Sequence, residues 1–121
     1  MAFEWRDYLG TALTLAAVNS ESCHRAAVSR AYYAAYGCAC DLAEKEGVPR
    51  PKKHHVAWQH FTDLHDMRRA KIGADGLRLK IRREAADYDK VPAVSKADAE
   101  DACKIAQALI GRVDVLLKRY P

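Results

Sequence analysis

The chain of 121 residues is large enough to bury a hydrophobic core without disulfide bonds. Half of its residues are hydrophobic but only 8% are aromatic, and alanine, which supplies much of the hydrophobic share, favours helices. No apolar run approaches the roughly twenty residues that span a bilayer, and the first residues alternate charged and aromatic side chains where a secretory leader has an apolar stretch. We therefore expect one helical domain over residues 1–121, located in the cytoplasm and without membrane contact.

The first two predicted helices cover residues 3–18 and 22–46, because apolar residues recur there at spacings of three and four. These apolar positions are Trp5, Leu9, Ala12 and Ala16 in the first helix and Val28, Tyr32, Ala35, Ala39 and Leu42 in the second. Gly47 and Pro49 end the second helix, because glycine suits a C-terminal cap and proline cannot continue the hydrogen-bond ladder. As the longest element, the second helix is expected at the centre of the bundle.

The remaining predicted helices cover residues 54–70, 77–89 and 95–120. The segment 73–76, with a glycine at each end, is interpreted as a break between the third and fourth helices. Arg68, Arg69 and Lys71 then lie at the C-terminal end of the third helix, where positive charge is favourable.

Ser95 and Asp98 resemble a capping box, with Asp in place of the usual Glu or Gln, and mark the start of the last helix. The apolar stripes are Leu77, Ile81, Ala85 and Tyr88 in the fourth helix and Ala102, Ile105, Leu109, Val113, Leu116 and Tyr120 in the fifth. Short loops between long helices favour antiparallel neighbours. The sequence therefore predicts an all-α, up-and-down bundle of four to five helices.

Four cysteines and five histidines are the candidate metal ligands. The cysteines fall within predicted helices, and we interpret them as small, buried, reduced thiols. Cys38 and Cys40 are two positions apart, which separates their side chains by about 200° around a helix, so the two thiols cannot coordinate the same metal ion. No two histidines stand at helical i,i+4 spacing. We expect no metal site and no cofactor.

The stretch 50–83 is the most basic part of the chain, with ten Lys or Arg against three Asp, a net charge of +7. Such a block attracts phosphate, whereas the commoner explanation of a charge run is a solvated helix face. Both explanations stay open on the sequence alone. The chain has no Gly-rich phosphate loop and no serine or cysteine nucleophile motif.

Two short motifs are more specific than any other part of the chain. Residues 29–35 read Ser-Arg-Ala-Tyr-Tyr-Ala-Ala, and residues 83–88 read Arg-Glu-Ala-Ala-Asp-Tyr. Together these motifs resemble the HEPN domain, the higher eukaryotes and prokaryotes nucleotide-binding domain. The resemblance implies a four- or five-helix bundle that forms a homodimer, with polar side chains of the second motif meeting their symmetry mates across a cleft.

Many HEPN proteins are metal-independent endoribonucleases of toxin–antitoxin and defence systems, with an active motif of arginine followed four to six residues later by histidine. Here Arg83 is followed at that distance by Tyr88 and by no histidine. Arg83 can stabilise a phosphorane, whereas a tyrosine phenol donates a proton more readily than it takes one. The catalytic candidates are therefore Arg83, Asp87 and Tyr88. The histidines of the predicted third helix are His54, His55, His60 and His65, and the sequence does not place them relative to Arg83.

The residues expected to bind RNA or nucleotide combine positive charge with one aromatic ring. They are Arg30, Tyr33, Lys52, Lys53, Lys80 and Arg82. Several have a structural alternative. Tyr32 and Tyr33 lie on an alanine-rich helix and are more often core or dimer contacts than base-stacking platforms. Arg30 is either a snorkelling surface group or held by a carboxylate such as Asp87, and Arg83 and Asp87 can simply pair at i,i+4 spacing.

Three functions are compatible with these residues. The first is a module of a toxin–antitoxin or defence-type system that binds RNA or nucleotide in a homodimer cleft, with or without RNA cleavage, beside an antitoxin partner. The alternative is a non-catalytic partner or substrate of a small nucleotidyltransferase, with Tyr88 as the acceptor of an adenylyl group. The third is a purely structural helical dimer, which binds neither RNA nor nucleotide.

Overall fold

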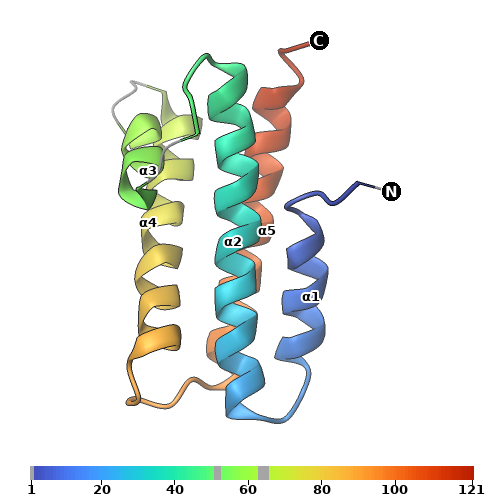
Figure 1. The fold of residues 1–121 in the computed structure, drawn as a ribbon, viewed down its shortest axis with the longest axis vertical. Helices are drawn as coiled ribbons and strands as arrows, with labels where there is room; N and C mark the ends of the chain where they lie inside the picture. The colour runs from blue at the N-terminus through green and yellow to red at the C-terminus, as the bar shows by residue number, and fades with distance from the viewer. Residues whose placement is uncertain (1, 51–52, 63–65) are drawn as a thin grey trace.

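The computed structural model describes residues 2–50, 53–62 and 66–121. Its helices are α1 (Asp7–Ala16), α2 (Glu21–Lys45), α3 (His54–Thr62), α4 (Met67–Tyr88) and α5 (Lys96–Leu117). Figure 1 shows that the successive long helices run antiparallel, whereas the short α3 lies against one end of α4. The described residues contain no strand. The prediction of an all-α, up-and-down bundle is confirmed.

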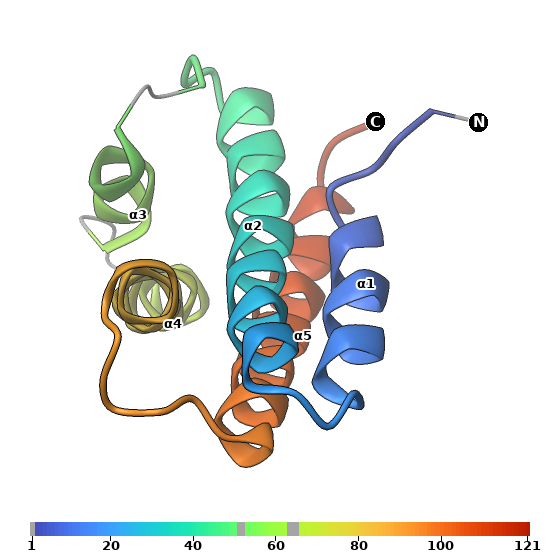
Figure 2. The ribbon, with the colours of Figure 1, turned by 60° about the horizontal axis from the view of Figure 1, so that its bottom comes forward.

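The central element is α2, which contacts α1, α3, α4 and α5 (Figure 2). Its alanine-rich faces let the neighbouring helices approach closely, and the stripe predicted for it is buried from Val28 to Leu42. The stripe predicted for α5 is also largely buried, with Leu109, Val113 and Leu116 in the same core. Local periodicity therefore identified the inner faces of both helices correctly.

The cysteines are free thiols within helices, as predicted. Cys38, Cys40 and Cys103 are buried, and Cys23 is half-buried. Burial raises the pKa of the Cys38 thiol to about 11, so this side chain stays protonated and unreactive near neutral pH.

Both predicted helix boundaries with a capping signal are confirmed. Gly47 follows α2 with φ = 86°, and the Val48 N–H donates to the Ala43 carbonyl at 3.0 Å, which is the glycine-dependent Schellman arrangement. At the start of α5, the Ser95 hydroxyl accepts from the Asp98 N–H while the Asp98 carboxylate accepts from the Ser95 N–H. These reciprocal bonds complete the capping box.

The predicted break at 73–76 is wrong, because α4 passes through this segment without interruption. The glycines serve close packing instead. A Cβ atom added to Gly76 would lie 2.2 Å from Cε3 of the Trp58 ring, and one added to Gly73 would lie 2.5 Å from Cγ2 of Thr62. Glycine is therefore required here for the close approach of α3 to α4, and the true boundary between these helices lies near Asp66, whose carboxylate caps α4.

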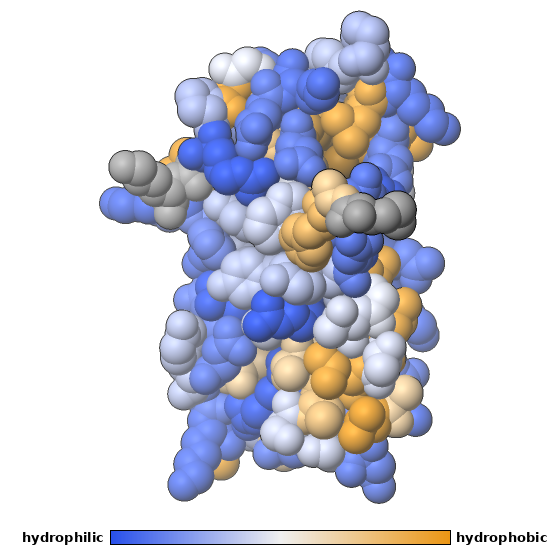
Figure 3. All heavy atoms as spheres, turned by 45° about the vertical axis from the view of Figure 1, so that its right-hand side comes forward, coloured by the Kyte–Doolittle hydropathy of each residue, from blue (hydrophilic) through white to orange (hydrophobic). Residues whose placement is uncertain are grey.

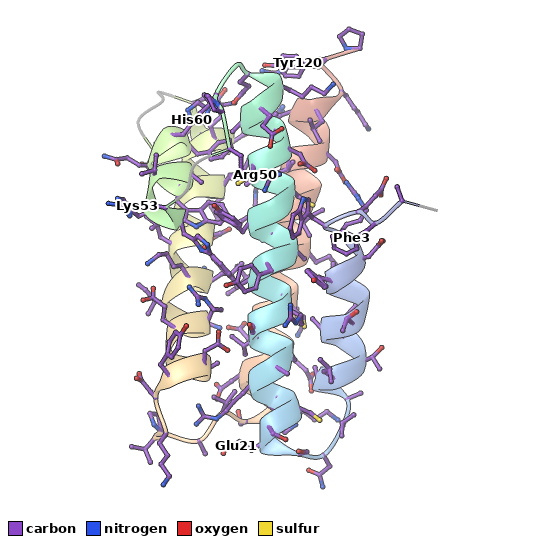
Figure 4. All side chains as sticks on the ribbon, in the orientation of Figure 1. Phe3, Glu21, Arg50, Lys53, His60 and Tyr120 are labelled. Carbon is purple, nitrogen blue, oxygen red and sulfur yellow. The ribbon has the colours of Figure 1, made fainter. Side chains whose placement is uncertain are left out.

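Arg68, Arg69 and Lys71 accordingly lie in the first turns of α4, and their predicted position at a helix C-terminus is wrong. Arg69 is buried and pairs with Glu46, just after the end of α2. The same carboxylate contacts His60 of α3, with 3.0 Å between Nε2 and Oε1 (Figure 4). One buried ion pair therefore joins α2, α3 and α4 at this end of the bundle.

Candidate functional site

A charged residue occupies a position of α4 where the helix pattern requires an apolar one. On the side that faces the core, α4 buries Ile72, Gly76, Leu79 and Ala86 at spacings of three and four. Arg83 fills the place in this series between Leu79 and Ala86, and its side chain is only 11% exposed. Burial of a charge is costly unless it is paired, so Arg83 is the first indication of a functional site.

Arg83 is held mainly by aromatic rings. The central carbon of its guanidinium lies 5.3 Å from the ring centroid of Tyr32 and 5.6 Å from that of Tyr33. One Arg83 nitrogen, Nη1, lies 3.6 Å from Oδ2 of Asp87, which is an ion pair too long for a good hydrogen bond. Its Nε is buried without a hydrogen-bond partner in the described structure. The guanidinium therefore has donors left for a ligand.

A chain of hydrogen bonds runs from α3 to α2 and back beside Arg83. The Trp58 indole N–H donates to the Tyr32 hydroxyl at 3.1 Å, and that hydroxyl lies 2.8 Å from Nδ1 of His54. The His54 ring stacks on Tyr36, with 4.2 Å between centroids. Burial lowers the pKa of His54 below its ordinary value, and the positive charges of Arg83 and Lys80 lower it further. His54 is therefore neutral at physiological pH.

These side chains form one cluster between α2, α3 and α4, which we call the Arg83 cluster. Its members are Tyr32, Tyr33, Tyr36, His54, Trp58, Lys80, Arg83 and Asp87. Ser29 extends it, because its hydroxyl donates to Asp87 at 3.4 Å. Lys80 pairs with Glu84 at 2.7 Å on the outer side of the cluster. The cluster combines a cation, polar donors and aromatic rings, which together suit a phosphate and a base.

Four of the predicted site residues belong to this cluster: Tyr33, Lys80, Arg83 and Asp87. Three others lie outside it, although the Tyr88 phenol interacts electrostatically with Arg83. Tyr88 is 76% exposed, beyond Asp87 at the end of α4. The other two are Arg30, whose guanidinium lies over the Tyr8 ring of α1 at 5.0 Å, and Arg82, which pairs with Asp101 of α5. The partner of Arg30 is thus an aromatic ring, and Asp87 pairs with Arg83.

The remaining candidates are the two lysines before α3. Lys53 is exposed, immediately ahead of the first turn of that helix (Figure 4). Lys52 lies outside the described residues. Neither is assigned to the Arg83 cluster.

Much of the basic stretch 50–83 is neutralised by acidic partners. Arg50 folds back onto α2 and pairs with Asp41 and Glu44, as its position beside that helix in Figure 4 illustrates. Lys71 and Arg78 share the carboxylate of Asp75. Several cations of the stretch are therefore paired within the protein, as expected for a charge run that also serves the fold.

Tyr88 lines a shallow hollow of about 350 Å³ at the C-terminal end of α4. Arg25 and Lys90 border the same hollow with Asp87. Arg25 also shapes it, because its guanidinium donates to backbone carbonyls of the segment that follows α4, including that of Asp89 at 2.6 Å. The exposed phenol thus shares the hollow with two cations, Arg25 and Lys90, and with three acids, Glu21, Asp87 and Asp89.

The apolar stripe predicted for the fourth helix faces outward and not into the bundle. Leu77, Ile81 and Tyr88 are all exposed. They belong to a series with alternating spacings of three and four, which we call the α4 outer stripe. Its members are Met67, Ala70, Ala74, Leu77, Ile81, Glu84 and Tyr88. This spacing is typical of a seam that packs against a second helix.

The opposite side of the bundle lacks such a regular series. On the face that carries α1, hydrophobic patches interrupt a mostly hydrophilic surface (Figure 3), and the exposed apolar residues Phe3, Leu13 and Val18 do not follow a heptad spacing. Isolated apolar side chains are normal on protein surfaces. The α4 outer stripe is therefore the better candidate for a helix-packing surface.

Sequence reasoning named His54 among four unplaced histidines and did not foresee Trp58 as a member of the site. His54 and Trp58 are four positions apart, so they share one face of that helix, and both contact the Tyr32 hydroxyl. The sequence did contain a signal for this contact, namely the four-residue spacing of His54 and Trp58 together with the adjacent tyrosines Tyr32 and Tyr33 of α2. It did not indicate which face of α3 packs against which neighbour.

Within residues 2–50, 53–62 and 66–121, no three His, Cys, Asp or Glu side chains converge as a metal site requires. None of the helices in these ranges has the length and apolar character of a membrane span. Comparison of the chain with protein-family models, curated proteins and solved structures gives no match. The functional conclusion therefore depends on the geometry of the Arg83 cluster and on the two motifs.

Proposed function

We propose that this chain is a HEPN-type helical bundle that binds RNA or a nucleotide through the Arg83 cluster, as a homodimeric component of a toxin–antitoxin or defence-type system. The observation that carries the proposal is the guanidinium of Arg83, held at a core-facing position with an unpaired Nε. The guanidinium is held by two rings and by one long contact to Asp87, so it keeps hydrogen-bonding capacity that an acceptor of a ligand can use. The resemblance of residues 29–35 and 83–88 to HEPN motifs supports the nucleotide class.

Phosphate is the ligand group that fits Arg83 best. Guanidinium groups form paired, charge-assisted hydrogen bonds with phosphate oxygens, and the long contact to Asp87 leaves Arg83 free to form them. Tyr33 is half-buried beside the guanidinium and offers a ring for base stacking. A single-stranded nucleic acid provides both the phosphate and the base.

The α4 outer stripe supports homodimerisation. Its heptad spacing matches that of a helix that packs against a parallel or antiparallel copy, and its exposed residues include Leu77, Ile81 and Tyr88. Arg83 projects from the other side of α4, toward α2. We therefore assign the ligand to one protomer and the dimer contact to the outer stripe, so that the same helix serves both.

Substitution of Arg83 tests the binding site. Arg83→Met keeps an unbranched apolar stem but removes the charged guanidinium, and we expect it to weaken binding of a single-stranded RNA by at least about tenfold, which corresponds to about 1.4 kcal/mol. Fluorescence anisotropy with a labelled oligonucleotide measures this affinity, and wild-type binding should weaken steeply with salt. Arg78→Met is the matched control, because Arg78 is exposed on α4 and its partner, the buried Asp75, keeps Lys71 and Arg112. Equal affinities of the two variants, or binding indifferent to salt, would refute the proposal.

A second candidate function is favoured by the surroundings of Tyr88. Its exposed phenol lines the same hollow as Arg25 and Lys90 and is accessible to a nucleotidyltransferase that carries ATP. The phenolic oxygen would attack the α-phosphorus, lose its proton to a base of the transferase, and displace pyrophosphate. The added phosphate would lie near both cations.

Mass spectrometry of the chain coexpressed with its gene neighbour tests this modification. We expect one adenylyl group, located on Tyr88 by peptide mapping and absent from Tyr88→Phe. Tyr120→Phe is the control, because Tyr120 is also exposed but lies after α5. An unmodified wild-type chain in the presence of an active transferase contradicts this function and leaves RNA binding untouched.

A further inference from the structure

The Tyr32 hydroxyl determines where His54 carries its proton. An indole nitrogen can only donate, so the Tyr32 oxygen accepts the bond from Trp58. Tyr32 is fully buried, and its own hydroxyl proton has one acceptor among the described residues, Nδ1 of His54 at 2.8 Å. Nδ1 is therefore the bare nitrogen of the imidazole ring, and Nε2 carries the hydrogen.

The other tautomer is disfavoured by the same burial. If Nδ1 carried the proton, the Tyr32 oxygen would accept from both His54 and Trp58, and the Tyr32 O–H would be left without an acceptor in the part of the chain that the structure describes. An unsatisfied buried donor is unfavourable. Ionisation of Tyr32 does not relieve this, because burial raises the pKa of its phenol well above the ordinary value.

The charge state of His54 follows from all the groups around its ring. From α2 the facing groups are Tyr32, Tyr33 and Tyr36; from α3 it is Trp58; and from α4 they are Lys80, Arg83 and Glu84. The two cations of α4 and the burial outweigh Glu84, so the pKa of His54 is lowered. His54 is consequently a neutral donor through Nε2–H at neutral and alkaline pH.

We infer that Tyr32, supported by Trp58, is a positioning residue that holds His54 as a neutral Nε2–H donor to a phosphodiester bound at Arg83. His54 and Arg83 contact the same two rings, those of Tyr32 and Tyr33, and we therefore assign one ligand to both. In this state Nε2 has no lone pair with which to take a proton from a ribose 2′-hydroxyl. His54 in this state therefore binds the phosphodiester and does not act as the base of a cleavage reaction. The phosphodiester ligand in this inference rests on the proposed RNA binding, whereas the tautomer of His54 does not.

Long-range proton–nitrogen NMR of the full chain reads the tautomer directly. We expect the His54 ring, identified by comparison with His54→Gln, to show a protonated Nε2 and a bare Nδ1 between about pH 6.5 and 8. Tyr32→Phe removes the hydroxyl and should move part of the proton to Nδ1 and raise the His54 pKa. Tyr33→Phe is the matched control on the same helix and should leave the tautomer unchanged. A wild-type His54 with its proton on Nδ1 overturns the inference, whether or not the Tyr32 variant folds.

RNA binding and cleavage provide the second readout. Affinity for a single-stranded RNA should survive in His54→Gln, whose amide still donates, and fall about fivefold in His54→Leu, as expected for the loss of one hydrogen bond. Wild-type protein with a chelator should leave the RNA intact. Cleavage that disappears in His54→Gln would show that His54 acts as a base and overturn the inference. Absence of RNA binding, with the expected tautomer present, would refute the proposed function alone.

Discussion

Replacement of Glu46 by Gln is expected to lower the free energy of unfolding by about 3–5 kcal/mol. Glu46 and Arg69 pair at the junction of α2 and α4, and Arg69 is only 8% exposed. Loss of the carboxylate charge leaves the guanidinium buried without an anion, which costs more than the pair itself contributes. His60 also loses its charged hydrogen-bond acceptor. Urea denaturation of the two proteins at pH 7 measures the difference.

The same pair makes stability depend on pH. Burial by itself would raise the pKa of Glu46, but hydrogen bonds from Arg69 and His60 lower it below the ordinary value. The contribution is therefore complete above the unfolded pKa of about 4.3, and it is lost as the pH falls through the lower folded pKa. In Glu46→Gln, the free energy of unfolding should therefore fall less at acid pH than in the wild type.

Glu44→Gln is the control, since Glu44 pairs with Arg50 at the surface. We expect this substitution to change the free energy of unfolding by no more than about 0.5 kcal/mol. Equal stabilities of the two variants would contradict a structural role for the buried pair.

Substitution of Ile81 by Lys is expected to abolish the homodimer while the monomer remains folded. Ile81 is 68% exposed in the bundle, so its replacement removes little packing within one protomer, and lysine is a good helix former. In a dimer joined through the α4 outer stripe, each copy would place an ammonium group in the seam. Like charges brought together in an interface cost several kcal/mol, so we expect the dissociation constant to rise by at least about 100-fold.

Sedimentation equilibrium of the wild type and of Ile81→Lys measures this effect. Val115→Lys is the matched control, because Val115 is exposed on α5 away from the stripe. Circular dichroism should show the same helicity for all three proteins. A wild-type chain that stays monomeric, or an Ile81→Lys chain that still dimerises, would exclude the outer stripe as the contact.

Two sides of α4 thus carry different properties. The inner side brings Arg83 against the tyrosines of α2, and the outer side presents the apolar stripe. Glycines at 73 and 76 let α3 approach this helix closely, which brings His54 and Trp58 to the Tyr32 hydroxyl. The packing glycines and the Arg83 cluster are therefore parts of one arrangement.

Local patterns were sufficient for most of the fold. The repeat of apolar residues in α2 and α5, the glycine at 47 and the capping box at Ser95 all depend on residues close in sequence, and the structure confirms each of them. The pair of Arg83 and Asp87 was foreseeable for the same reason, because one helical turn separates them. Helix propensity, capping and i,i+4 contacts are local interactions, which a sequence displays directly.

The position of His54, the continuity of α4 and the direction of its apolar stripe required the tertiary structure. A glycine can break a helix or allow a neighbouring helix to approach closely. Which of the two occurs at Gly76 depends on Trp58, eighteen positions earlier. An apolar stripe identifies a face but not the partner of that face, so Ile81 and Leu79 look equivalent in sequence although one is exposed and the other buried. His54 and Arg83 come together only because α3 folds back along α4. These features depend on packing between distant segments, which local periodicity does not encode.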